Sequence, residues 1–171
     1  MKAKRPLTER GKAHIKAHNL QVLTVIGGTT IYAMPDGKYI CFVADLDVCT
    51  DGTGDHHGDS TPLDTTAYNP YLNADKDKYI VVPPQVRTMP DPVVLGCQAK
   101  VTRLDTQKSS PAVVGEIGPN TKTGEAAICL AQHLNPDVSA NDGDERTIYF
   151  YELWPGTPAK VGSKIYKLQP A

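Results

Sequence analysis

The sequence lacks the features that mark several large classes of protein. No apolar stretch among its 171 residues approaches the roughly 20 residues that a membrane-spanning helix needs. The net charge is −1, so no general electrostatic attraction to nucleic acid or to an anionic membrane is expected. The four cysteines show no Cys-x-x-Cys spacing, which argues against a zinc ribbon. We therefore expect a globular protein with no membrane span and no nucleic-acid partner.

Sequence signatures of common enzyme mechanisms are missing as well. The chain has no Gly-x-Ser-x-Gly element, and neither a P-loop nor a Gly-x-Gly-x-x-Gly element follows a strand-like run. The basic segment 1–19 is not followed directly by the apolar core of a secretory signal, so we expect no cleaved signal peptide.

Turn-forming residues and short apolar runs dominate what the sequence does contain. Glycine and proline occur 14 times each, a composition that favours many short strands over long helices. Gly27 and Gly28 separate two β-branched runs and predict a hairpin. We expect the last strand-like run to close the sheet. The strand-like runs are 20–34, 38–48, 78–84, 93–104, 111–117, 147–154 and 164–169.

Helical periodicity is clearest in one place. Small and apolar residues repeat at helical spacing and predict one principal helix near residues 124–134. Strands outnumber helices and do not alternate with them, so we expect a mainly β (α+β) fold with a compact β-barrel-like core. The double-psi barrel is one candidate topology. We divide the chain into a basic N-terminal arm, residues 1–19, with one helical turn as an option, and a single β-rich domain, residues 20–171.

Two acidic residues nine positions apart are the strongest sign of chemistry. Glu116 lies in an apolar, strand-like run, and these surroundings favour its protonated form. Glu125 opens the expected helix, where the positive end of the helix dipole would favour its ionised form. A protonated carboxyl group suits a general acid and an ionised one a general base, although the two roles could be exchanged. Lys122, between them, is a candidate glycan contact.

An acidic stretch follows the run 38–48. Asp45 and Asp47 are two residues apart at the end of an expected strand, so their side chains share a face. With Asp51 they offer carboxylates that would attract a cationic substrate. The EF-hand calcium pattern fails because Cys49 stands where a third acidic ligand belongs. Two other interpretations are a transition-metal site that uses these aspartates with His56 or His57, and a solvated loop whose carboxylates cap backbone N–H groups.

One tyrosine and the four cysteines are the remaining residues of interest. Tyr68 either stacks on a sugar ring or packs its own loop. Cys41 and Cys129 lie among apolar residues and are expected to be buried free thiols. A disulfide between Cys49 and Cys97 is an option in an oxidising compartment.

Four segments in combination resemble glycoside hydrolase family 75, the fungal and bacterial endo-chitosanases. The resemblance covers about residues 39–134 and continues loosely through 151–156. It implies that Glu116 and Glu125 are the catalytic pair and that the anomeric configuration is inverted. Two departures matter: Glu116 stands where the family usually has aspartate, and Cys49 replaces one aspartate of the early acidic segment. The segments are DLDVCTDG, YIVVPP, VVLGCQAKV and AVVGEIGPNTKTGEAAICLA.

The resemblance implies a glycosidase that cleaves β-1,4 linkages of an amino-sugar polymer, with chitosan as the first choice. Asp45, Asp47, Asp51, Tyr68 and Lys122 are then the expected substrate-binding residues. We expect no metal and no cofactor, a polysaccharide as the partner molecule, and a monomer.

Two alternatives stay open. One is a peptidoglycan hydrolase of phage or secreted-effector type, because peptidoglycan is also built on N-substituted amino sugars. The other is a non-catalytic glycan-binding or structural module. In either hydrolase case we expect the protein to act outside the cell or at the cell envelope, and to be cytoplasmic before a release that uses no visible signal peptide.

Overall fold

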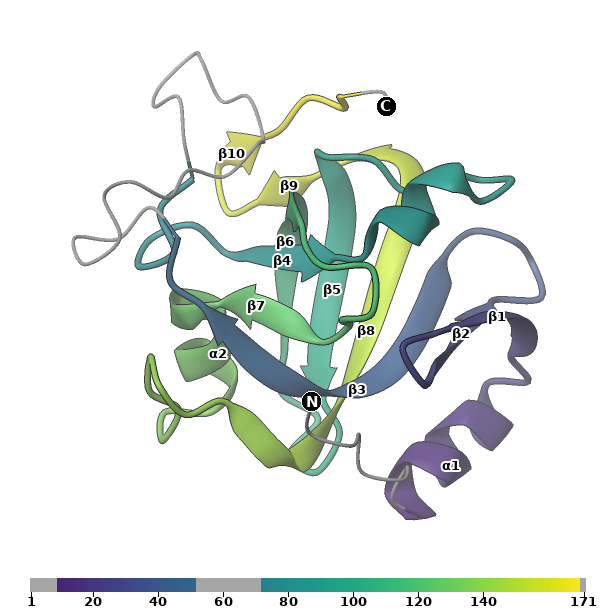
Figure 1. Cartoon of the computed structure of the whole chain (residues 1–171), viewed down its shortest axis with the longest axis horizontal. Helices are drawn as coiled ribbons and strands as arrows, with labels where there is room; N and C mark the ends of the chain where they lie inside the picture. Colours follow the sequence, from purple (N-terminus) through teal and green to yellow (C-terminus); the bar gives the residue numbers. More distant parts are fainter. Residues whose placement is uncertain (1–8, 52–71, 170–171) are drawn as a thin grey trace.

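The computed structural model describes residues 9–51 and 72–169. In these residues the protein is mainly β, with a closed barrel of six strands, one short helix packed against the barrel and a second helix near the N-terminus (Figure 1). No helix within the described residues has the length and apolar character required to cross a membrane. The elements are α1 (Glu9–Ala17), β1 (Gln21–Ile26), β2 (Thr29–Ala33), β3 (Ile40–Cys49), β4 (Tyr79–Val82), the 3₁₀ helix η1 (Pro84–Thr88), β5 (Cys97–Arg103), β6 (Ser109–Ile117), β7 (Glu125–Ala127), α2 (Ile128–Leu134), β8 (Asp144–Pro158), β9 (Lys160–Val161) and β10 (Lys164–Ile165).

The barrel closes because β8 pairs with strands on both sides. The order in the eight-stranded sheet is β1-β2-β3-β7-β4-β6-β5-β8, and β8 also pairs with β3. The expectation that residues 164–169 close the sheet is wrong. β10 pairs only with β9 in a separate two-stranded sheet, because the two long ladders of β8 leave no open barrel edge for it to join.

The barrel mixes parallel and antiparallel neighbours. β3 runs parallel to β7, and β4 runs parallel to β6, whereas the other barrel pairs are antiparallel. The mainly β, barrel-like fold is therefore confirmed, and its double-psi variety stays a prediction.

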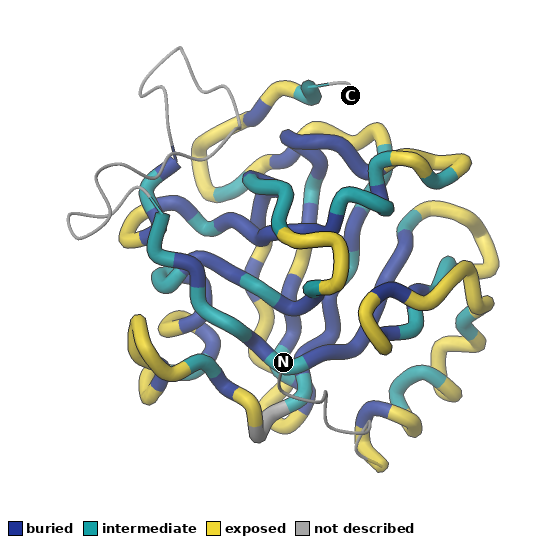
Figure 2. The backbone as a smooth tube through the Cα atoms, in the orientation of Figure 1, coloured by how far each residue is buried: buried dark blue, intermediate teal, exposed yellow. Residues whose placement is uncertain are grey.

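Aromatic and aliphatic side chains fill the core. Buried residues run along the barrel strands, and most exposed residues lie in the connecting turns and the outer elements (Figure 2). The rings of Phe42 and Tyr151 are stacked with their centroids 4.8 Å apart. The hydroxyl of Tyr151 donates to the carbonyl of Asp45 at 2.9 Å, so this buried polar group is satisfied.

The N-terminal elements pack outside the barrel. The hairpin predicted at Gly27 and Gly28 is confirmed, since both glycines have positive φ and join β1 to β2. The arm holds a nine-residue helix, α1, which is longer than the single turn considered from the sequence. The ring of His14 on α1 lies 4.3 Å from that of Phe150 on β8, and this contact docks the helix against the sheet.

The principal helix begins later than predicted. Residues Glu125–Ala127 form strand β7, and α2 starts at Ile128. The expectation that Glu125 opens a helix is therefore wrong. Hydrogen bonding of β7 to β3 on one side and β4 on the other outweighs the local helical pattern, because both edges of this short strand are paired.

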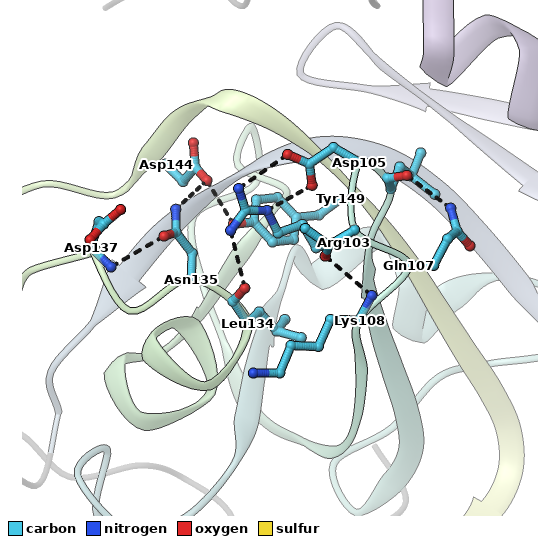
Figure 3. A network of polar contacts seen from close by, with 11 residues as sticks. Arg103, Asp105, Gln107, Lys108, Leu134, Asn135, Asp137, Asp144 and Tyr149 are labelled. Atoms are coloured by element: carbon cyan, nitrogen blue, oxygen red, sulfur yellow. Dashed lines mark hydrogen bonds and ion pairs between the residues drawn. The ribbon is translucent and has the colours of Figure 1, made fainter.

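A polar network ties the end of α2 to the barrel (Figure 3). The buried carboxylate of Asp144 accepts hydrogen bonds from Tyr149 at 2.7 Å and from Asn135 at 2.8 Å. The guanidinium of Arg103 donates to the carbonyl of Leu134, the last residue of the helix. Strands β5 and β8 and the C-terminal end of α2 are thus held together by satisfied polar groups.

Gly124 offers a test of the packing in front of β7. It has φ +77, and an added Cβ would lie 2.6 Å from the carbonyl oxygen of Asp45. Gly28 has φ +80 but no atom within 4 Å of an added Cβ, so it is a matched control. We expect Gly28→Ala to cost about 1–2 kcal/mol from backbone strain alone. Gly124→Ala should cost roughly 1–3 kcal/mol more because of the clash. Equal losses of unfolding free energy in urea would contradict this close approach.

Candidate active site

The barrel register aligns three carboxylates across four neighbouring strands. Glu116 on β6 pairs with Val81 on β4, Val81 pairs with Glu125 on β7, and Glu125 pairs with Asp47 on β3. Directly paired residues point to the same face of a sheet. We call Glu116, Glu125 and Asp47 the carboxylate row. Strands are spaced by about 4.8 Å, so the backbones of Glu116 and Glu125, two strands apart, are separated by about 10 Å.

The side chain of Glu116 reaches across the barrel. The thiol of Cys49 on β3 donates to Oε2 of Glu116 at 3.5 Å. β3 and β6 are three places apart in either direction around the six-stranded ring, so this contact crosses the barrel instead of following the sheet. The side chain of Asp51, just beyond β3, is hydrogen-bonded to that of Glu116. Side chains from opposite walls therefore converge at one end of the carboxylate row.

The surroundings of Glu116 favour its protonated form. Burial raises the pKa of Glu116 to about 8, and the hydrogen bond and the negative charge of Asp51 act in the same direction. Burial also raises the pKa of Cys49 to about 12, so its thiol keeps a proton to donate. The hydroxyl of Tyr79 lies 3.3 Å from Sγ of Cys49 and completes this group.

Glu125 has a cation beside it. Nζ of Lys122 lies 3.4 Å from Oε2 of Glu125 and 3.5 Å from Oδ2 of Asp47. Burial raises the pKa of Glu125 above its ordinary value, and the charge and hydrogen bond of Lys122 offset only part of this rise. The helix dipole expected from the sequence plays no part, because Glu125 lies on a strand. Its ionised form is favoured by an ion pair.

Lys122 stays charged between its two partners. Burial works against the charged form, but Glu125 and Asp47 outweigh it and raise the pKa of Lys122. The lysine lies in the loop 118–124 that joins β6 to β7, and its backbone N–H donates to the carbonyl of Pro119. The predicted site residue thus belongs to the site through ion pairs with two carboxylates.

The remaining predicted residues fall in three positions. Asp51 belongs to the group around Glu116. Asp45 is half-buried on β3 beside Gly124, where Oδ1 of Asp45 would lie 3.4 Å from a Cβ added to the glycine. Tyr68 lies outside the described residues. The structure therefore brings Asp51 to Glu116, and Lys122 to Glu125 and Asp47.

Cys49 and Tyr79 were not predicted as site residues. All four cysteines are free in the structure, so the disulfide option for Cys49 and Cys97 is wrong. Cys41 is buried as expected, whereas Cys129 is only partly buried. A sequence signal existed for Tyr79, since it precedes Val81 by two residues on one strand and shares its face. No comparable local signal existed for Cys49, because its contact with β6 joins distant parts of the chain.

One set of donors has the composition of a metal site. Ligand atoms of Cys49, Asp51 and Glu116 all lie within 4.8 Å of one another. A thiolate with two carboxylates would suit zinc better than calcium, which prefers oxygen ligands alone. Binding would require Cys49 and Glu116 to lose the protons that their surroundings favour.

No protein-family model matches this chain, and no curated protein matches it significantly. The resemblance to glycoside hydrolase family 75 stays a prediction, so a function must be argued from the geometry and protonation of the carboxylate row.

The raised pKa of Glu116 predicts a pH-dependent stability. The unfolded chain releases this proton near the ordinary pKa of 4.5, whereas the folded protein keeps it up to about pH 8. Between these values the folded state binds more protons, so the stability contributed by Glu116 is lost as the pH rises. Glu116→Gln removes this dependence. We expect the variant to gain stability relative to the wild type from pH 4.5 to pH 8, measured by urea unfolding. If the unfolding free energies of the variant and the wild type changed in parallel between pH 4.5 and pH 8, the raised pKa of Glu116 would be contradicted.

Proposed function

We propose that the protein is a glycoside hydrolase that cleaves β-1,4 linkages of an amino-sugar polymer, with chitosan as the first candidate substrate. In this proposal Glu116 is the general acid and Glu125 is the general base. One observation carries it: two half-buried carboxyl groups share a face of the barrel but have opposite partners, an acidic group at Glu116 and a cation at Glu125. An acid/base glycosidase needs one carboxyl group that keeps its proton and one that is ionised, and these partners favour that division.

The protonation states support these roles. At neutral pH a carboxyl group with a pKa of about 8 is mostly protonated, so Glu116 has a proton to give to the leaving oxygen. The ion pair with Lys122 favours the carboxylate of Glu125, which would take a proton from the attacking water. Asp51 therefore contributes by raising the pKa of Glu116, which keeps this carboxyl group protonated at neutral pH.

The spacing supports an inverting reaction. A retaining enzyme needs its carboxyl groups about 5–5.5 Å apart, whereas an inverting enzyme needs about 6.5–9.5 Å to admit a water. Residues on adjacent strands would suit the shorter distance. Glu116 and Glu125 are separated by the whole of β4, so their backbones stand about 10 Å apart. A backbone separation of this size is compatible with the wider carboxyl spacing of an inverting enzyme, which the family resemblance implies.

The acidic side chains support a cationic substrate. Asp45, Asp47 and Asp51 were expected to bind glucosamine units, and Asp47 and Asp51 belong to the site. Lys122 neutralises part of this charge through its ion pairs, which weakens the attraction for a polycation. That observation favours peptidoglycan, an amino-sugar polymer without free amines along most of its backbone, as the second candidate. Either polymer lies outside the cytoplasm, so the proposal includes export.

The substrate is identified by incubation with glucosamine oligomers and, separately, with purified sacculi, followed by mass spectrometry of the products. Chain shortening of the oligomers with uptake of water supports the chitosanase proposal. Release of disaccharide–peptide fragments from sacculi supports the cell-wall alternative. Binding to either polymer without any product would overturn the enzyme proposal in favour of a glycan-binding module.

Substitution of either glutamate tests the mechanism. Glu116→Gln and Glu125→Gln should each fold normally and lose about 10²-fold or more in kcat, because each removes one proton-transfer group. Glu152→Gln is the matched control: Glu152 on β8 also has a pKa raised by burial, but it is not part of the carboxylate row. Turnover retained by either variant would remove that glutamate from the mechanism.

The pH profile provides a second, independent test. We expect kcat/KM on soluble glucosamine oligomers to fall above about pH 8, because Glu116 loses the proton that it donates. At the acid end the rate should fall as Glu125 is protonated. A rate that continues to rise between pH 8 and pH 10 would show that Glu116 is not the acid.

A further inference from the structure

We propose that Lys122 is a positioning residue that holds Glu125 as a carboxylate, and that the β1–β2 hairpin clamps the loop 118–124 that carries this lysine. The proposal rests on the proposed function, in which Glu125 is the base. It assigns Lys122 a role within the protein instead of the glycan contact expected from the sequence.

The lysine is held at two points. Its ammonium lies between Asp47 and Glu125, 3.5 Å and 3.4 Å from their carboxylate oxygens. These two residues face each other directly across β3 and β7, so both anchors have fixed backbones. An ammonium bound to both carboxylates is kept beside Glu125. The Lys122 side chain is only partly exposed to water, so its charge acts on Glu125 more strongly than a fully exposed charge would.

The hairpin holds the loop from one side. The hydroxyls of Thr29 on β2 and Thr123 in the loop are hydrogen-bonded at 2.8 Å, and both residues are buried. At the hairpin turn, a Cβ added to Gly27 would lie 1.8 Å from the carbonyl oxygen of Thr121, so the two backbones are in direct contact. Only glycine permits this approach.

Two further contacts hold the loop from the barrel side. The side-chain amide of Gln85 on η1 donates to the carbonyl of Asn120 at 2.5 Å. The backbone N–H of Asp47 donates to the carbonyl of Gly124 at 2.7 Å. The loop is therefore fixed before, at and after Lys122, unlike a surface loop that carries a freely moving lysine.

This cation matters because, in the part of the chain that the structure describes, the other groups that shift the pKa of Glu125 disfavour its charge. Burial, Asp47 and Asp51 raise the pKa of Glu125, and Lys122 opposes them. Without Lys122, both glutamates of the site would tend to keep their protons, and the site would hold two acids and no base. Within residues 9–51 and 72–169, the charged and titratable groups around Glu125 are Lys122 on the loop, Asp47 on β3, Asp51 just beyond β3, Glu116 on β6 and Tyr151 on β8.

The test measures the pKa of Glu125 directly, without any substrate. Side-chain carboxyl carbons of the ¹³C-labelled protein are titrated by NMR, and Glu125→Gln identifies the resonance. We expect Lys122→Met to raise the pKa of Glu125 by about one unit or more, because an adjacent opposite charge has an effect of that size. Lys122→Arg should restore it close to the wild-type value. The exposed Lys76, on the turn before β4, provides the control Lys76→Met, which should change nothing.

An unchanged Glu125 pKa in Lys122→Met would overturn the proposal. So would an equal rise in Lys122→Arg, because the effect would then not follow from the positive charge. If the wild type hydrolyses neither polymer while the pKa depends on Lys122 as described, the proposed function fails and the positioning role of Lys122 stands. If the enzyme is active, the acid limb of kcat/KM should move to higher pH in Lys122→Met by the same amount.

The clamp is tested with the double variant Thr29→Val/Thr123→Val. Both hydroxyls are removed together, so neither is left buried without its partner and the protein should remain folded. We expect faster hydrogen exchange at the amide of Lys122 and a Glu125 pKa between those of the wild type and Lys122→Met. Wild-type exchange and a wild-type pKa in this variant would overturn the role of the hairpin.

Discussion

The double pairing of β7 is the constraint on which the site depends. This strand of three residues is hydrogen-bonded to β3 on one side and to β4 on the other, and the second strand in turn pairs with β6. The register of these three ladders places Asp47, Glu125 and Glu116 on one face. A slip by one residue in any ladder would turn a carboxylate to the opposite face, so the chemistry and the barrel are specified by the same hydrogen bonds.

Within that row, two residues of the same type acquire different properties from their neighbours. Half-buried Glu116 lies beside a thiol and another carboxyl group, whereas half-buried Glu125 lies beside an ammonium. Burial alone would raise the pKa of both groups. Partner chemistry therefore distinguishes the two glutamates. The three partners, Cys49, Asp51 and Lys122, lie close to the row in space but do not come from the strands that carry the glutamates.

Local patterns allowed part of this arrangement to be predicted. The hairpin at Gly27 and Gly28 is specified by its own turn residues, and the strand-like runs by β-branched composition. The pair Glu116 and Glu125 was predicted from spacing and resemblance, and the register of β6, β4 and β7 aligns the two residues. β7 was mistaken for the start of a helix, because its conformation depends on two partners elsewhere in the chain. The contact of Cys49 with Glu116 depends on the closure of the barrel, which no local pattern encodes.

The length of β8 has a consequence for how the molecule opens. Its 15 residues form ladders with both β3 and β5, so the strand cannot peel away from one neighbour and leave the barrel intact. Partial unfolding that begins at this strand must break two ladders at once, which favours an all-or-none transition. The parallel neighbours β3–β7 and β4–β6 are far apart in sequence, so closure requires many long-range contacts and should be slow. The barrel therefore cannot close before β8 has been synthesised, because β8 supplies the ladders to both β3 and β5.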